Sequence, residues 1–319
     1  MRFPALSGGL PGPSLSFDRE ETMSAEPELV ALDASLTERQ AEELLRSITI
    51  PSCPAILTTL MHEARQDDVD FPKIVRLIAS DVGLAASVLK TANSPFFALR
   101  SKVQNVQQAM SVLGLKNLIS IITSVTLRTS LSPPGVNMER FWDRSGYAAA
   151  VCSHIARVTR SVNRDLAYTF GLFHDCGIPI LMQRFPDYKQ TLAQANDTGE
   201  DILNIEYARH ATNHAIVGSM LARNWQLPVE VVQAIALHHE HELLEDAREG
   251  KATGEVRALI AICHIAAYAV ARFLDVREDR EWVVHGGKAM GYLGLDADEL
   301  TEMIIEIKEQ LSEIRDSKL

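Results

Sequence analysis

The sequence predicts an all-α protein, and three observations indicate this class. Aromatic residues make up only 6% of the 319 residues, while Ala, Leu, Ile and Val dominate the middle of the chain, a mixture that favours helix-on-helix packing. Apolar residues recur at helical spacing along most of the chain. No segment alternates apolar and polar residues for long enough to predict a strand.

Turn residues and helix caps divide the first half of the chain into short helices. These signals are the capping box of Thr37 and Gln40, the prolines Pro51 and Pro54, Pro72 in a first helical turn, Asp81 as an N-cap, the stop at Asn93 to Pro95, and Gly114 as a C-cap. The apolar stretch 118–127 predicts a helix buried on most sides. The clearest interior break is Ser132-Pro133-Pro134-Gly135, which predicts a subdomain boundary.

The second half repeats the helical pattern. Helices are predicted at about 139–161, 165–183, 199–209, 213–224, 228–239, 255–275 and 297–315. The predicted organisation is a disordered tail over 1–36, an N-terminal helical subdomain over 37–131, a second helical subdomain over 138–245, and C-terminal helices over 255–319 that complete the domain. The last helix carries an apolar stripe that either docks on its own domain or recruits a partner.

Composition excludes several classes of function. The chain carries 31 basic and 42 acidic residues, a net charge of -11, so its surface repels a phosphate backbone and we expect no nonspecific nucleic-acid binding. No run of about 18 apolar residues is evident, so we expect no membrane span. Four widely spaced cysteines in apolar surroundings predict reduced thiols and a cytoplasmic protein.

Histidines are the candidate functional residues, because most of the ten follow the Ser-Pro-Pro-Gly break. His174 and Asp175 form a dyad within a predicted helix, where one ion above the helix edge can contact both side chains. His210 and His214 share a face if one helix spans them, but Asn213 resembles an N-cap that would separate them. Each histidine alone is explained as a hydrogen-bonded core residue, and a metal site needs ligands from neighbouring helices. No nucleophile elbow, phosphate-binding loop or H-E-x-x-H motif competes with this cluster.

Ordered motifs give the chain a family resemblance. They are the Pro51/Pro54 pair, LIASDVGLAASVLKTANSPFF (77–97), VQQAMSVLGLKNL (106–118), GLFHDCG (171–177) and NHAIVGSMLARNWQLPVEVVQAIALHHE (213–240). On these motifs the chain resembles the HDOD family, the HD-related output domain of bacterial signalling proteins, over about residues 48–241. The resemblance implies an N-terminal helical subdomain packed on an HD-like helical subdomain, and a role in signal transduction.

Two departures from the HD pattern bear on activity. HD hydrolases hold their metal with a first His, the His-Asp dyad and a later Asp, and the resemblance puts Arg144 and the pair Cys263-His264 at the first and last of these places. Arginine does not ligate metals. We therefore expect no catalytic residue and no metal, and predict that Arg144 forms a buried ion pair with Asp175 in the place of the ion. If a divalent metal binds nevertheless, the candidate ligands are His174, Asp175, His214, His238 and His264.

Two functions follow as expectations. The first is a noncatalytic, regulatory signal-transduction module that binds a signalling protein partner or a nucleotide-like effector in a groove between the subdomains. The candidate groove residues are Asn93, Ser94, Arg144, His174 and Asp175, of which Asn93 and Ser94 are equally explained as turn residues. The alternative is a metal-dependent HD-type phosphohydrolase or phosphodiesterase with a variant metal site, its substrate attracted by the basic stretch between Asp81 and Glu139. The sequence leaves the oligomeric state open.

Overall fold

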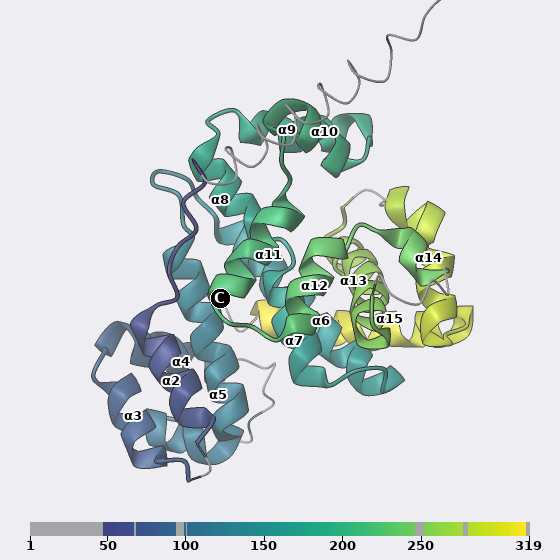
Figure 1. Ribbon diagram of the computed structural model, residues 1–319. Coiled ribbons are helices and arrows are strands. Elements are labelled where there is room, and N and C mark those ends of the chain that lie inside the picture. The colour runs from purple at the N-terminus through teal and green to yellow at the C-terminus, as the bar shows by residue number, and fades with distance from the viewer. Residues whose placement is uncertain are drawn as a thin grey trace, which may run out of the picture. The chain divides into compact units, whose positions relative to one another are not determined.

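The apolar periodicity of the sequence is realised as a series of helices, with no strand among the residues that the structure describes (Figure 1). The computed structural model describes residues 47–66, 68–93, 99, 101–245, 252–276 and 280–316. The predicted tail over 1–36 and the capping box of Thr37 and Gln40 lie outside these ranges. The described residues belong to one compact unit.

Four helices at the start of the described part of the chain form a small bundle. They are α2 (Ala55–Ala64), α3 (Phe71–Ala79), α4 (Val82–Ala92) and α5 (Val106–Ser130). Asp81 caps α4 as predicted, because its carboxylate accepts a hydrogen bond from the backbone N–H of Leu84 at 2.9 Å. Helix α5 packs against the other three helices of this bundle and also contacts α7.

Helix α5 is kinked at Gly114. The predicted C-cap has φ 77° and ψ 168° there, a conformation that favours glycine, and the chain then resumes as a helix rather than ending. Helices α5 and α13 are long and apolar enough, by length and mean hydropathy, to cross a membrane, although charged residues interrupt the apolar sequence of both. The kink divides α5 into two pieces shorter than the roughly 20 residues that a span needs, and 78% of the apolar window of α13 is buried inside the protein. Helix α13 is therefore explained as a core helix, whereas 39% of the apolar window of α5 is buried.

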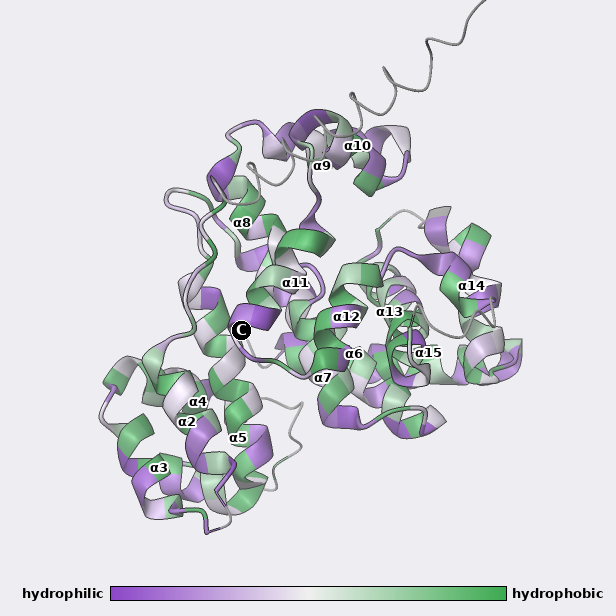
Figure 2. Cartoon of the chain, in the orientation of Figure 1, coloured by the Kyte–Doolittle hydropathy of each residue, from purple (hydrophilic) through white to green (hydrophobic). Residues whose placement is uncertain are grey.

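The remaining described helices follow α5 in the chain. They are α6 (Glu139–Thr159), α7 (Arg164–Phe173), α8 (Gly177–Arg184), α9 (Tyr188–Thr198), α10 (Ile202–His210), α11 (His214–Asn224), α12 (Val229–Leu237), the 3-10 helix η2 (His241–Leu244), α13 (Gly254–Phe273), α14 (Arg280–Leu293) and α15 (Ala297–Asp316). Helix α13 contacts α6, α7, α12, α14, α15 and η2. Figure 2 shows that hydrophobic residues predominate on α12, whereas hydrophilic residues are frequent on α9 and α10.

Two details differ from the sequence prediction, and one alternative that it left open is decided. The helix predicted over 165–183 is broken into α7 and α8, and the dyad lies in the turn between them. Helices α9 and α14 were not predicted. The apolar stripe of α15 docks on its own domain, against α13 and α6, with Leu300, Met303 and Ile307 buried.

Candidate metal centre

The dyad is positioned by a close contact between two helices. His174 is the C-cap of α7, and Gly177 begins α8 two residues beyond Asp175. A Cβ atom on Gly177 would lie 2.0 Å from the backbone oxygen of His214, at the start of α11. Only a glycine permits this approach, and it brings the dyad beside His214.

The neighbouring histidines stand at helix ends. Asn213 caps α11 by accepting a hydrogen bond from the backbone N–H of Ile216 at 2.8 Å, so α11 begins at His214. Helix α10 ends at His210, which is hydrogen-bonded to the hydroxyl of Thr191 at 2.8 Å. The helix is therefore interrupted between His210 and His214, so these two histidines do not share a helix face. His238 is the C-cap of α12, and α12 packs against α11.

Four imidazoles and one carboxylate converge. His174 Nε2 lies 3.2 Å from Asp175 Oδ2, and His214 Nε2 and His238 Nε2 lie 3.6 and 3.8 Å from Asp175 Oδ1. His214 Nε2 also lies 3.4 Å from His238 Nε2 and 3.1 Å from His239 Nε2. These five residues are called the dyad cluster below. Its side chains are largely closed to solvent, from 2% exposed for His214 to 23% for Asp175.

Hydrogen bonds on the outer side of the cluster fix which ring nitrogens carry protons. His174 Nδ1 donates to the carbonyl of Gly171 and His238 Nδ1 donates to that of Ile235, both at 2.8 Å, because a carbonyl oxygen only accepts. His214 Nδ1 donates to the carboxylate of Glu206 at 2.9 Å. Metal-ligating histidines characteristically have their other ring nitrogen bound in this way.

The inner side of the cluster is made of acceptors wherever a ring carries its proton on Nδ1 alone. Such a ring presents an Nε2 lone pair to a carboxylate that also only accepts. Acceptors at such separations repel one another unless a cation lies among them. A proton on one ring relieves part of this repulsion, whereas a divalent ion satisfies several acceptors at once.

Burial and neighbouring charges tune these groups in different directions. Burial, followed by the imidazoles of His239 and His214, holds the pKa of His238 well below its usual range, so this ring stays neutral. Burial disfavours charge on His214, but its hydrogen bond to Glu206 and the nearby carboxylates of Glu206, Asp175 and Glu281 together outweigh burial and raise its pKa. Burial would raise the pKa of Asp175, yet the surrounding imidazoles hold it well below its usual range, so its carboxylate is ionised.

The spacing of the donor atoms fits a transition metal. Two ligands bound at 2.0–2.1 Å to one tetrahedral ion stand about 3.3 Å apart. The separations among Asp175, His214 and His238 are 3.4 to 3.8 Å. Neutral imidazole and carboxylate are ligands suited to zinc, iron or manganese. The residues present therefore fit a divalent metal ion.

Four of the five predicted metal ligands meet here, and His264 does not. His264 Nε2 contacts His241 Nδ1 in a neighbouring group on η2 and α13. His239, which was not among the predicted ligands, takes the fifth place. The donor set thus depends on neither of the positions at which the chain departs from the HD pattern.

The predicted ion pair of Arg144 with Asp175 is wrong. Arg144 is exposed on α6, and among the described residues Asp175 forms ion pairs within 4.0 Å only with His174, His214 and His238. Glu206 is the functional residue that the sequence did not reveal. It is fully buried and accepts hydrogen bonds from the hydroxyl of Tyr188 and from His214, but a carboxylate on a short amphipathic helix carries no spacing signal.

Asn93 has a structural role. Its side-chain amide donates to the carbonyl of Val103 at 2.9 Å and its oxygen accepts from the N–H of Val103 at 2.8 Å, which joins the two ends of the connection between α4 and α5. Ser94 lies outside the described residues. The turn explanation for Asn93 therefore accounts for its two side-chain hydrogen bonds without any ligand.

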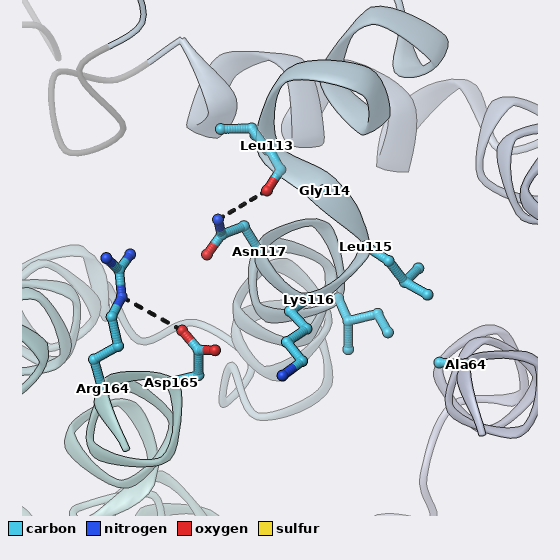
Figure 3. A pocket seen from close by; sticks show the side chains of 9 residues that line it. Ala64, Leu113, Gly114, Leu115, Lys116, Asn117, Arg164 and Asp165 are labelled. Atoms are coloured by element: carbon cyan, nitrogen blue, oxygen red, sulfur yellow. Dashed lines mark hydrogen bonds and ion pairs between the residues drawn. The ribbon is translucent and has the colours of Figure 1, made fainter. Parts of the chain in front are cut away.

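A cavity of about 540 Å³ lies at the kink of α5, away from the predicted groove (Figure 3). The described residues that line it are Ala64, Leu113, Gly114, Leu115, Lys116, Asn117, Ile119, Arg164 and Asp165. Asn117 donates to the carbonyl of Leu113, and Arg164 pairs with Asp165 at 3.6 Å, as Figure 3 shows. None of the described candidate groove residues lines this cavity.

Two curated proteins are similar to this chain. An uncharacterized protein of Treponema pallidum (strain Nichols) is 27% identical over 265 residues, which are 81% of this chain and 49% of the relative. The cyclic di-GMP phosphodiesterase CdgJ of Vibrio cholerae serotype O1 is 22% identical over 174 residues, 51% of this chain and 40% of that protein. The chain thus spans half or less of the length of these curated relatives.

A solved structure and a family model complete the comparison. The structure of an HDOD domain protein with unknown function from Geobacter sulfurreducens is 24% identical, has a TM-score of 0.67, and the match covers 88% of this chain and 99% of that one. The family model of the HDOD domain matches residues 50–241, which include the whole dyad cluster. The chain belongs to the HDOD domain family.

Proposed function

We propose that this chain is a noncatalytic signal-transduction module whose dyad cluster holds one divalent transition-metal ion. In this proposal the ion joins the α7–α8 turn to the ends of α11 and α12, and the fixed arrangement is presented to a signalling protein partner or a nucleotide-like effector. The observation that carries the proposal is the convergence of three Nε2 lone pairs on the carboxylate of Asp175. Their outer nitrogens are already hydrogen-bonded, so the lone pairs are available.

A structural or regulatory ion accounts for the cluster better than a catalytic one. Catalytic zinc sites keep one coordination position open for water or substrate, whereas structural sites are closed by four protein ligands. The dyad cluster offers five donor side chains, and the imidazoles of His214 and His238 are 2% and 4% exposed. Such a closed set leaves little room for a phosphoester.

Metal content tests the proposal. The proteins are purified without tag or chelator, or reconstituted with Zn²⁺. We expect His238→Gln to contain one molar equivalent of metal less than the wild type. The matched control His62→Gln alters an exposed histidine outside the cluster and should keep the wild-type content. Ion binding should also stabilise the wild type by about 2.7 kcal/mol at a free metal concentration 100-fold above Kd. Equal metal content in wild type and His238→Gln would refute the proposal.

A phosphodiesterase remains the second candidate function, and two observations favour it. The chain is similar to part of a cyclic di-GMP phosphodiesterase, and Asp175 is the most exposed side chain of the dyad. A bound divalent ion would supply Lewis-acid polarisation and an activated water. The residues of the chain would orient that ion through Asp175 and exclude bulk water through the buried imidazoles.

Turnover separates the two candidates. The metal-loaded protein is incubated with cyclic di-GMP and with bis(p-nitrophenyl) phosphate, and the noncatalytic proposal expects no hydrolysis above that of the free metal. Hydrolysis that disappears in Asp175→Asn, with metal content measured in parallel, would establish the enzyme instead.

A further inference from the structure

The cavity at the kink of α5 is bounded by three helices. Its volume of about 540 Å³ is lined by the last residue of α2, by residues of α5 between 113 and 119, and by the first two residues of α7. A Cβ atom on Gly114, where α5 is kinked, would meet no neighbouring atom within 4 Å, which leaves this side of the kink open. Small-molecule sites in proteins have volumes of roughly 300–1,000 Å³, so the cavity is large enough for a ligand.

The charged side chains of the cavity wall leave an excess of positive charge. Lys116 comes from α5, and Arg164 and Asp165 come from α7. Arg164 Nε lies 3.6 Å from Asp165 Oδ1, so the carboxylate already faces one cation. Figure 3 shows that no ion pair joins Lys116 to the other residues drawn around the cavity. An anionic group would therefore find an ammonium that no carboxylate of the described wall neutralises.

The sequence around the kink adds to this positive charge. The whole chain has a net charge of -11, yet residues 82–138, which contain all of α5, include no acidic residue. The same stretch carries Lys90, Lys102 and Arg128 in addition to Lys116. A local excess of cations raises the concentration of anions at the surface beside it. Charge thus favours an anion over a cation as the occupant of the cavity.

Aliphatic side chains make up the other part of the wall. They are half-buried and belong to Ala64, Leu113, Leu115 and Ile119. Figure 3 shows the charged side chains and Asn117 on one side of the view, and Leu115 and Ala64 on the other. None of the described residues of the wall is aromatic, so a nucleotide base would find no ring to stack on. The lining instead suits a ligand with an aliphatic body.

We propose that the cavity at the kink of α5 binds a small amphipathic anion, in which a carboxylate or phosphate head is attached to a short aliphatic body. Lys116 and Arg164 attract the head, because they are the cations of the wall. The body covers Leu115, Ile119 and Ala64 and removes their apolar surface from water.

Helix α7 connects this cavity to the dyad cluster. It begins at Arg164 and ends at Phe173, and His174 is its C-cap. Ten residues of helix are about 15 Å long. An anion attracted by Arg164 therefore acts on one end of the helix whose other end carries the dyad. The anion site goes beyond the proposed function and does not require a metal ion in the dyad cluster.

Isothermal titration calorimetry on the full, metal-free chain tests this site. The probes are octanoate and octyl phosphate, which share a body and differ in the head, and 1-octanol, which has the same body without charge. We expect at least one of the two anions to bind with a stoichiometry of one, and the tighter of them to identify the preferred head. Octanol should bind more weakly by at least about fivefold, the upper value for the loss of one exposed ion pair.

Three variants place the binding in this cavity. Lys116→Gln removes an exposed charge of the wall and should weaken anion binding by about fivefold without affecting octanol. The matched control Lys90→Gln removes an exposed lysine of α4 that does not line the cavity, and should keep the wild-type affinity. Ala64→Phe places a ring in the cavity and should abolish binding of both anions.

The outcomes separate this site from the proposed metal centre. Absence of saturable binding by either anion, octanol that binds as tightly as the anions, or equal affinity in Lys116→Gln and Lys90→Gln would overturn the proposal. His238→Gln, which tests the dyad cluster, should bind the anion as the wild type does, so failure of the metal centre leaves this result intact. Circular dichroism identifies any variant that fails to fold, and Lys116→Gln, at an exposed position, then decides the question.

Discussion

Changing Glu206 to glutamine removes the charge behind His214 while preserving the shape of the side chain. In the wild type one carboxylate oxygen accepts from both the N–H and the Nδ1–H of His214, and the other accepts from the hydroxyl of Tyr188. In the variant the amide oxygen can take over the first role, and the NH₂ group can donate to the Tyr188 oxygen. Packing should therefore survive, but His214 should become a less basic ligand.

The expected magnitude follows from this geometry. Loss of such an outer partner reduces metal affinity by about 10- to 100-fold, which corresponds to about 1.4 to 2.7 kcal/mol. Because Glu206 is fully buried, water cannot replace the lost charge. Glu206→Gln should still fold, with a smaller loss in the free energy of unfolding of the metal-free protein, on the order of 1 kcal/mol.

Competition with a chromophoric chelator at pH 7.5 measures the affinity, and urea unfolding measures the stability. Tyr188→Phe is the matched control, because it removes a donor to Glu206 but keeps the carboxylate on His214. It should lower stability by roughly 1–3 kcal/mol with little change in metal affinity. Wild-type affinity in Glu206→Gln, or an equal loss of affinity in Tyr188→Phe, would refute the reasoning.

Other changes test the contacts that hold the site. Gly177→Ala should lower the free energy of unfolding by roughly 3 kcal/mol and weaken metal binding, because its Cβ would meet the backbone of His214. Gly287→Ala is the control, because a Cβ atom there would meet open space, and it should raise the free energy of unfolding by about 0.5–1 kcal/mol in the same urea titration. Thr191→Val should lower stability by about 1–3 kcal/mol, because the ring of buried His210 loses its partner. Burial lowers the pKa of His210 in the folded state. Below about pH 6.5 the imidazole is therefore protonated in the unfolded chain but not in the folded one, so the free energy of unfolding should fall as the pH decreases. A free energy of unfolding that does not change between pH 7 and pH 5 would contradict this.

Local chemistry explains which parts of the fold were predictable. Asp81 and Asn213 cap their helices as their sequence contexts indicated, because a cap depends only on residues within one turn. The break between α7 and α8 was not predictable, because the apolar pattern runs through it. It is associated with the contact of Gly177 with His214, which is 37 residues away in sequence and visible only in three dimensions.

The candidate site shows the same division. Residue type was enough to recognise the dyad, His214 and His238 as candidate ligands. How α11, α12 and α13 pack decides that these residues lie in one cluster and His264 in another. Arg144 was placed by the resemblance at the position of a ligand, yet it lies on the exposed side of α6. Residue type indicated which side chains can bind a metal, and tertiary packing decided which of them lie together.

His239 stands between the dyad cluster and α14. Its Nε2 lies 3.1 Å from His214 Nε2, and its Nδ1 lies 3.4 Å from Glu281 Oε1. A neutral imidazole has a single lone pair, so an ion that binds Nε2 requires the proton to be on Nδ1, where it can be donated to Glu281. In the proposed function, a filled dyad cluster would therefore be connected to α14 through this one imidazole.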